Sequence, residues 1–185
     1  IVPGGLAITP LFAVRGDALT IDTSDLIRSE AFRAIGTAGL DVRWPVLFST
    51  TSATHVLEPV VQIFARNNER YAGELPNEDA QSFVFDASNL LERDKFSGWD
   101  RIEGGTRANF ALRYSGTYSN GWSANALFGQ SYHLAGQNPF ASPDLVAVGA
   151  YSGLETDTSD FVAAAGLANG RGLSFGARGR FDERT

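Results

Sequence analysis

The sequence has 185 residues, of which 21 are Asp or Glu and 15 are Lys or Arg, so the formal net charge is −6. This balance argues against a nucleic-acid-binding protein, which needs a basic face to meet the phosphates. The absence of cysteine excludes thiolate metal sites and cysteine nucleophiles, and no apolar run approaches the ~18 residues of a membrane helix. The chain has no methionine and begins at Ile1 without the features of a signal peptide, so we expect an internal part of a longer chain.

Alternation of apolar and polar residues predicts three strands in the first third of the chain. The strand near residues 6–14 is the weakest, because Pro10 suggests a sheet edge or a bulge. The second strand runs from Phe32 to Phe48, with apolar residues at even positions. Its odd positions carry Arg33, Thr37, Asp41 and Arg43. The third strand covers residues 57–66, and its polar face carries Glu58, Gln62 and Arg66.

Four further strands form two predicted hairpins. The first joins residues 106–118 to residues 122–133 through a turn with an Asn-Gly step, which suits the positive φ angles of a tight hairpin. The second joins residues 161–167 to residues 173–181. This makes about seven strands, an odd number below the roughly eight of the smallest bacterial barrels. We therefore expect an incomplete barrel.

The connections between these strands alternate in length. The short ones lie near residues 49–53, 119–121 and 168–172, and the long ones at residues 17–30, 67–104 and 135–157. Short turns on one side and long loops on the other are the plan of outer-membrane barrels. We expect residues 67–104 to form a long extracellular loop that covers the outer mouth as a lid. Residues 143–154 could add a further strand.

Alternation alone fits two fold classes. In a soluble β-sandwich or lectin-like domain the apolar face is buried, whereas in a membrane barrel it meets lipid and the charged face lines the lumen. Long strands, the loop rhythm and aromatic residues near the strand ends favour the membrane barrel. These aromatic residues are Trp44, Phe48, Tyr114, Tyr118, Trp122 and Tyr132. We predict an all-β, antiparallel up-and-down transmembrane β-barrel, of which residues 1–185 form part of one domain.

No arrangement of residues points to an enzyme. Ser24, Ser97 and Ser131 lack a Gly-x-Ser-x-Gly frame, and neither His55 nor His133 lies beside a plausible nucleophile or in metal-ligand spacing. We therefore predict no catalytic, cofactor-binding or metal-binding residues.

Polar side chains on the charged face are the candidate functional residues. We expect these to face the lumen: Arg33, Asp41, Arg43, Glu58, Arg107, Arg113, His133, Arg178 and Arg180. Their guanidinium groups could bind phosphates or carboxylates, but we favour a hydrated, charge-balanced wall. A separate group, Trp99, Asp100 and Arg101, lies near Asp94 and Glu103. We interpret this group as a salt-bridged loop anchor rather than a catalytic pair or a cation site.

Four segments of the sequence together resemble one family. They are residues 57–67 (LEPVVQIFARN), 75–82 (LPNEDAQS), 94–107 (DKFSGWDRIEGGTR) and 128–132 (FGQSY). Their order and spacing are similar to the LptD family of lipopolysaccharide-assembly outer-membrane proteins, also called organic solvent tolerance proteins, of the alphaproteobacterial type. The resemblance runs from about residue 4 to residue 182 and implies an internal fragment of the family's C-terminal β-barrel.

The resemblance implies a function for the whole barrel. Family members receive lipopolysaccharide from a periplasmic LptA-like bridge, hold an LptE-like plug lipoprotein and insert lipopolysaccharide into the outer leaflet. The family's N-terminal periplasmic jellyroll, lateral gate and disulfide cysteines are not recognisable here. We predict a non-enzymatic component of the lipopolysaccharide translocon in the bacterial cell outer membrane, in contact with outer-membrane lipid, with no nucleic acid and no cofactor. The alternatives are a general porin or channel and a soluble β-sandwich carbohydrate-binding module.

Overall fold

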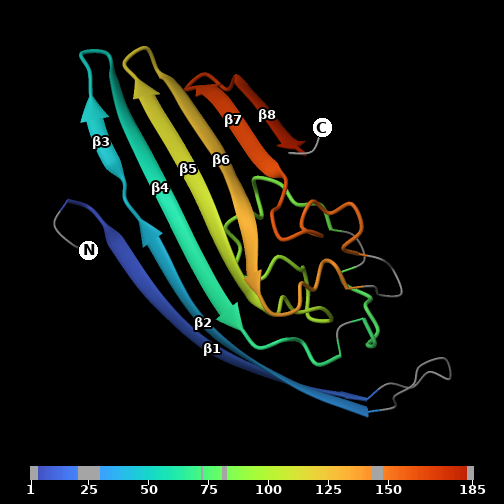
Figure 1. The fold of residues 1–185 in the computed structure, drawn as a ribbon. Coiled ribbons are helices and arrows are strands. Elements are labelled where there is room, and N and C mark those ends of the chain that lie inside the picture. The colour runs from blue at the N-terminus through green and yellow to red at the C-terminus, as the bar shows by residue number, and fades with distance from the viewer. Residues whose placement is uncertain (1–3, 21–29, 72, 81–82, 143–147, 183–185) are drawn as a thin grey trace.

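The computed structural model describes residues 4–20, 30–71, 73–80, 83–142 and 148–182. These residues form one antiparallel sheet of eight strands (Figure 1). The strands are β1 (Ala7–Thr20), β2 (Glu30–Arg43), β3 (Val46–Ser49), β4 (Ala53–Arg66), β5 (Thr106–Tyr118), β6 (Trp122–Ala135), β7 (Phe161–Asn169) and β8 (Ser174–Phe181). Their order is β1-β2-β4-β5-β6-β7-β8, with β3 beside β4, and the sheet does not close on itself. The predicted all-β, antiparallel, incomplete architecture is confirmed.

The described part of the chain contains no helix that is long and apolar enough to cross a membrane.

One predicted strand is interrupted. The pattern from Phe32 to Phe48 predicts a single strand, but the structure has β2 and β3, separated by Trp44 and Pro45. Pro45 has no N–H to donate to a ladder, so regular pairing stops there. The Trp44 N–H donates to the carbonyl of Pro59 at 3.1 Å, and both pieces stay beside β4. The eight strands therefore occupy seven positions in the sheet.

The short turns lie together at one end of the sheet (Figure 1). The turn between β3 and β4 is tighter than predicted, because Thr50 closes it: its N–H donates to the carbonyl of Ala53 at 2.8 Å, and its hydroxyl accepts from the Ala53 N–H at 3.1 Å. β4 consequently begins before the predicted residue 57. Between β5 and β6, Gly121 has the left-handed φ of 84° that the Asn-Gly step predicts.

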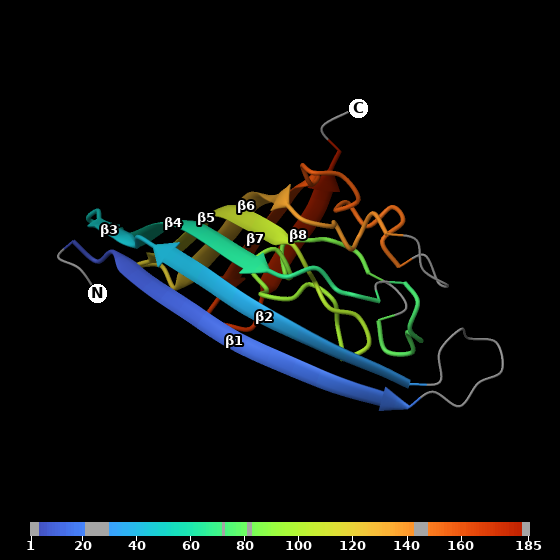
Figure 2. The same cartoon turned by 60° about the horizontal axis from the view of Figure 1, so that its bottom comes forward.

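The described parts of the connections after β4 and after β6 gather at the other end and fold over one face of the sheet (Figures 1 and 2). Loop side chains build a core with residues of β4, β5 and β7. The connection after β4 contributes Phe85, Leu90 and Phe96, and the connection after β6 contributes Phe140 and Leu154. The strands contribute Val60, Ala111 and Val162. The described residues of the 67–104 loop pack on one face of the sheet, because these apolar side chains are buried against the strands. That this loop covers the outer mouth as a lid stays a prediction.

The possible extra strand at residues 143–154 is absent from the described part of this segment. Residues 148–154 form turns and bends, and residues 143–147 lie outside the described residues. Tyr151 (φ 54°) and Gly153 (φ 87°) adopt left-handed conformations that no strand contains. The chain also passes so close to Phe140 that a Cβ on Gly149 would lie 1.9 Å from the Phe140 carbonyl oxygen. These constraints make the segment part of the folded loop cluster.

Candidate functional site: the charged face and the loop packed against it

The strand register gives the sheet two faces. We call the face that carries Val60 and Arg107 the inner face, because the loop core packs on it, and the opposite face the outer face. Pairing of Leu112 with Phe128 places apolar side chains on the outer face. Many of them are exposed: Phe12 by 83%, Phe175 by 60%, Phe128 by 50% and Phe110 by 45%. A soluble β-sandwich would bury such a face under a second sheet, and the described residues contain none.

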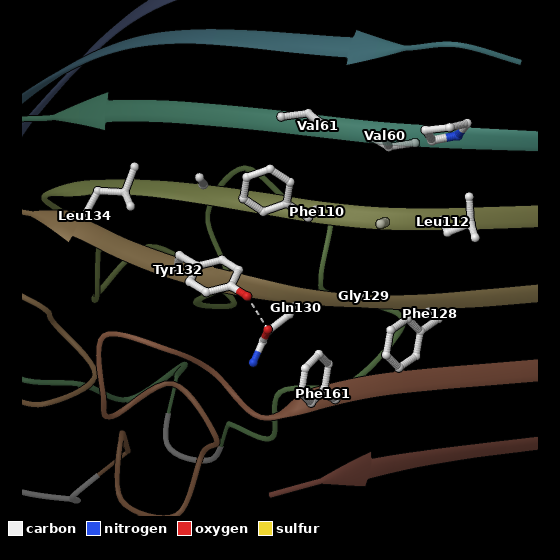
Figure 3. A pocket seen from close by; sticks show the side chains of 13 residues that line it. Val60, Val61, Phe110, Leu112, Phe128, Gly129, Gln130, Tyr132, Leu134 and Phe161 are labelled. Atoms are coloured by element: carbon white, nitrogen blue, oxygen red, sulfur yellow. Dashed lines mark hydrogen bonds between the residues drawn. The ribbon is translucent and has the colours of Figure 1, made fainter. Parts of the chain in front are cut away.

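A shallow hollow of about 720 Å³ lies on the outer face over β4, β5 and β6 (Figure 3). Its lining is largely apolar and includes Val61, Phe110, Phe128, Tyr132, Leu134 and Phe161. Gln130 also lines it, and its amide donates to the carbonyl of Ser159 at 2.7 Å while its oxygen accepts from the Tyr132 hydroxyl. Because this polar group is paired within the protein, the face is compatible with hydrocarbon.

Aromatic side chains gather on the outer face at the short-turn end. The ring of His55 stacks on Phe48 with 4.9 Å between centroids and on Tyr114 with 5.9 Å. The Tyr114 hydroxyl is hydrogen-bonded to His55 Nδ1 at 2.8 Å and to the Tyr118 hydroxyl at 3.1 Å. Such amphipathic rings, with their polar groups paired, are typical of the level at which a membrane meets water.

The length of β6 fits a membrane of ordinary thickness. Trp122 begins this strand at the short-turn end, and Tyr132 lies ten residues further along it, on the same face. Ten residues span roughly 33 Å of strand, or roughly 25 Å across the membrane at a tilt of ~40°. That is about the height of the apolar band of outer-membrane barrels.

All the candidate side chains that the sequence places on the charged face lie on the inner face. Their positions follow from the registers of β2, β4, β5, β6 and β8: Arg33, Asp41, Arg43, Glu58, Arg107, Arg113, His133, Arg178 and Arg180. The structure divides them into two groups. Arg33, Arg107 and His133 are buried beneath the loops, whereas the others are accessible to different degrees.

The accessible arginines among these candidates form ion pairs. The pairs are Arg43 with Asp41 (2.8 Å), Arg113 with Glu58 (3.0 Å), Arg178 with Asp86 (3.4 Å) and Arg180 with Asp160 (3.1 Å). Each arginine therefore has a carboxylate partner on a strand or in a loop. The charge-balanced wall, which we favoured over a phosphate site, stays a prediction.

Arg33 joins β2 to the loop. Its side chain is only 2% exposed, and it forms ion pairs with Asp17 of β1 at 2.6 Å and with Glu69 of the loop at 2.8 Å. It also donates to the carbonyl of Asp100 at 2.5 Å and to the carbonyl of Trp99. A buried guanidinium needs such a complete set of acceptors to offset the loss of water.

The group predicted as a loop anchor is attached mainly through its backbone and through Arg101. The Trp99 side chain is 71% exposed, and its carbonyl makes the contact with Arg33. The Asp100 carboxylate caps the neighbouring turn by accepting from the N–H groups of Glu78 at 2.7 Å and Asp79 at 3.3 Å.

Arg101 lies at the centre of the loop. It is 2% exposed, its Nε is 3.8 Å from Glu69, and it donates to the carbonyl of Pro139 at 3.0 Å. Its guanidinium also lies 4.7 Å from the ring centroid of Phe96. Arg101 thus links the 67–104 loop to the segment after β6, which sequence spacing could not indicate.

A second buried polar group lies between the loop and β5. Glu103 and Arg107 form an ion pair of 2.6 Å, and the Lys95 N–H donates to Glu103 at 3.0 Å. The Lys95 ammonium donates to Asn109 at 3.2 Å, and Asn109 donates to Gln62 of β4 at 3.2 Å. Glu103 and Arg107 were noted from the sequence, but the parts of Lys95 and Asn109 were missed, because sequence spacing does not show which residues meet between the loop and β5.

Burial shifts the pKa values of several loop groups. It raises the pKa of Asp94 to about 6, and the charge of Glu103 acts in the same direction. It lowers the pKa of Lys95 to about 8, although Glu103 opposes this change. Burial would also raise the pKa of Glu103, but Lys95 and Arg107 together hold it below its ordinary value. For Glu69, burial outweighs Arg101 and Arg33 and raises the pKa.

His133 is a structural residue of the loop corner. Its Nε2 lies 3.1 Å from the carbonyl oxygen of Gly136, which can only accept, so Nε2 carries the proton. The ring is 8% exposed and lies close to Gly105. Among the described residues, no group of three or more His, Asp or Glu side chains is arranged to hold a metal ion.

The sequence was compared with models of protein families and with curated proteins. A family model described as LptD, LPS transport system D, matches residues 1–185. The chain belongs to the LptD family. No curated protein matches it. LptD proteins are components of lipopolysaccharide transport and assembly at the outer membrane, a transport role rather than that of a known enzyme family.

Three of the four segments that carry the LptD resemblance come together in the fold. Residues 57–66 lie in β4 and residues 128–132 in β6, and β5 pairs with both strands. Residues 94–107 form the end of the loop and the start of β5. The LptD-like residues therefore build the place where the loop meets the inner face.

Proposed function

We propose that the chain forms part of the wall of an outer-membrane barrel that assembles lipopolysaccharide into the outer leaflet. The observation that carries the proposal is the two-faced sheet in a chain that matches the LptD model over residues 1–185. In this proposal the outer face meets lipid, and the inner face, with its arginines, carboxylates and His133, lines the lumen.

The open edges of the sheet support an incomplete barrel. In the described structure β1 pairs only with β2, and β8 pairs only with β7. Unpaired strand edges are not tolerated in hydrocarbon, so further strands must pair with them to close the wall. We infer that the chain is an internal fragment of the barrel domain, of alphaproteobacterial type on the basis of the four LptD-like segments, with the family's periplasmic jellyroll outside it.

The two ends of the sheet suggest its orientation. Short turns face the periplasm in outer-membrane barrels and long loops lie outside. On that basis residues 67–104 are an extracellular loop that packs into the outer half of the lumen and narrows it. Trp99, Asp100 and Arg101 anchor this loop through Arg33 and Glu69.

The uncovered half of the inner face is available to partners. It carries small polar side chains near the short turns, including Ser115, Thr117, Ser123 and Asn125. We infer that an LptE-like plug lipoprotein would contact this half, and that lipopolysaccharide would arrive from an LptA-like periplasmic bridge. The transport itself needs no group of this chain to react chemically.

Depletion of the full-length protein in cells tests the proposal. Newly made lipopolysaccharide should then accumulate in the inner membrane, measured by membrane fractionation and by its absence from the cell surface. A general outer-membrane channel is the second candidate, because a polar inner face with an inserted loop also suits a pore. Normal surface delivery after depletion would favour the channel and overturn the translocon.

A further inference from the structure

A polar crevice lies on the inner face beside the loop. It is bounded by β1, β2 and β4 on one side and by residues 91–93 of the loop on the other, and its volume is about 310 Å³. Its polar lining consists of Thr9, Asp41, Arg43, Gln62, Glu92 and Arg93. This volume lies at the lower end of the ~300–1,000 Å³ that is usual for small-molecule sites.

The strand side of the crevice is a preorganised polar wall. Arg43 holds both oxygens of Asp41, at 2.8 and 2.9 Å, and the Gln62 amide donates to the same carboxylate at 2.7 Å. Gln62 is in turn held by Asn109 at 3.2 Å. The Arg43 side chain is 37% exposed, and its Nη1 has no part in the contacts with Asp41, so it can donate into the crevice.

The loop side of the crevice offers two charged side chains, of which the Arg93 guanidinium already interacts electrostatically with Asp41. Among the described residues, neither the Glu92 carboxylate nor the Arg93 guanidinium has a hydrogen-bond partner or an ion pair, and both residues are exposed. The two walls thus present donors and acceptors toward the same space.

The balance of charge indicates the class of ligand. Asp41 and Glu92 are acidic, and Arg43 and Arg93 are basic, so the lining has no net charge and favours neither a phosphate nor a metal ion. Hydroxyl groups both donate and accept, and they match such a mixed lining. Leu11 and Leu91 add apolar surface for the C–H face of a sugar ring.

We propose that this crevice is a saccharide-binding subsite for the sugar portion of lipopolysaccharide. The proposal rests on the proposed function, since it takes the inner face as the wall along which lipopolysaccharide passes. The subsite would hold the sugar by hydrogen bonds to Arg43, Glu92 and Arg93. The contacts of Asp41 with Arg43 and Gln62 would stay unchanged.

Binding of lipid-free core oligosaccharide to the full-length protein in detergent tests the subsite. Thr9→Trp fills the crevice from β1 without changing its charge, and Ala177→Trp places the same ring at an exposed position on the outer face of β8, away from the crevice. We expect saturation-transfer NMR signals with the wild type and with Ala177→Trp, and loss of at least about tenfold in affinity with Thr9→Trp. Equal binding by Thr9→Trp, or no binding by the wild type, would overturn the subsite.

A second variant keeps the test decisive if Thr9→Trp does not fold. The double change of Glu92→Ala and Arg93→Ala removes the loop-side ligands at exposed positions, and it should weaken oligosaccharide binding by about tenfold. Inorganic phosphate at millimolar concentration should not compete with the oligosaccharide. Competition by phosphate would overturn the saccharide subsite and indicate an anion site instead. Lipopolysaccharide delivery is measured in a separate experiment, in depleted cells that are complemented with the wild type. Failure of the subsite proposal can therefore be distinguished from failure of the translocon proposal.

Discussion

Gly129 of β6 shows how closely the loop is seated on the inner face. A Cβ at this position would lie 2.3 Å from the carbonyl oxygen of Phe110 and 2.5 Å from Cδ2 of Leu90. Leu90 is fully buried in the loop core, so it has no space to move away. The absence of one side chain therefore permits the contact between loop and sheet.

Gly129→Ala is predicted to destabilise the protein by about 1–3 kcal/mol, the usual cost of overpacking. The measurement is the midpoint of denaturant unfolding of the full-length protein in detergent. Gly176→Ala is the matched control, because a Cβ on this inner-face glycine of β8 meets only the Ala165 carbonyl at 3.7 Å. Equal midpoints for the two variants would contradict the predicted close contact.

Asp94 is predicted to make the loop more stable as the pH falls. Its folded pKa, about 6, is above the ordinary 3.8, so its contribution to stability is fully present below pH 3.8 and is lost as the pH rises through about 6. Hydrogen-exchange protection of the Phe96 and Glu103 amides, which donate to Asp94, should therefore rise between pH 7 and pH 5.

The control for this pH dependence is Asp94→Asn, which keeps an oxygen for both amides but does not titrate. The difference in stability between the wild type and Asp94→Asn should change with pH by at most about 3 kcal/mol, the free energy that corresponds to a shift of about two pKa units. Glu69, whose pKa is also raised, is present in both proteins and cancels in the comparison. A pH profile unchanged by Asp94→Asn would assign the effect to another group.

At the scale of elements, the loop is attached to the sheet by buried polar contacts as well as by its apolar core. Arg33 of β2 holds Glu69 and the carbonyls of Trp99 and Asp100, while Glu103 pairs with Arg107 at the start of β5. Buried ion pairs are strongly destabilised when one partner is removed, because the other charge stays behind without water. The loop should therefore be detached more by loss of Arg33 than by loss of an accessible arginine.

Arg33→Met is predicted to expose the 67–104 loop to protease and to cost about 3–5 kcal/mol, because Glu69 is left buried without this partner. Arg113→Met is the matched control on the same face. Its pair with Glu58 is 48% exposed on the arginine side, and loss of such a pair costs about 1 kcal/mol or less. Limited proteolysis and unfolding midpoints of both variants measure the difference, and comparable behaviour would refute the anchoring role of Arg33.

At the scale of the whole molecule, the assignment of faces depends on what each face meets. The outer face carries exposed Phe, Leu and Val side chains, whereas the inner face carries paired charges and the folded loop. If the sheet is the wall of a barrel, adjacent residues of one strand must meet lipid and water alternately.

Single cysteine labels at Leu112 and Arg113 should report opposite environments in the full-length protein in lipid. Residues 1–185 include no cysteine, so each label is unique within this region. A spin label at position 112 should be accessible to oxygen in the bilayer, and one at position 113 to a water-soluble relaxation agent. The reverse pattern would exchange the two faces and refute the proposed lumen.

Much of the fold could be predicted from the sequence because strand side chains alternate with a period of two. Arg33 and Phe32, or Arg113 and Leu112, differ by one position and therefore lie on opposite faces whatever the tertiary arrangement. The break at Pro45 was missed, since the apolar alternation continues through it while the hydrogen bonding does not. The turns at residues 119–121 and 168–172 followed from Gly and Asn positions, which act locally.

The sequence by itself determined the strands, the polarity of their faces, the short turns and the likeness to the LptD family, because all of these depend on neighbours along the chain or on ordered motifs. Only the tertiary structure decided that the long loop lies on the inner face and that Arg33 meets Glu69, 36 residues away. Such contacts depend on which buried charges and apolar side chains can satisfy one another across the sheet, and local pattern does not encode that choice.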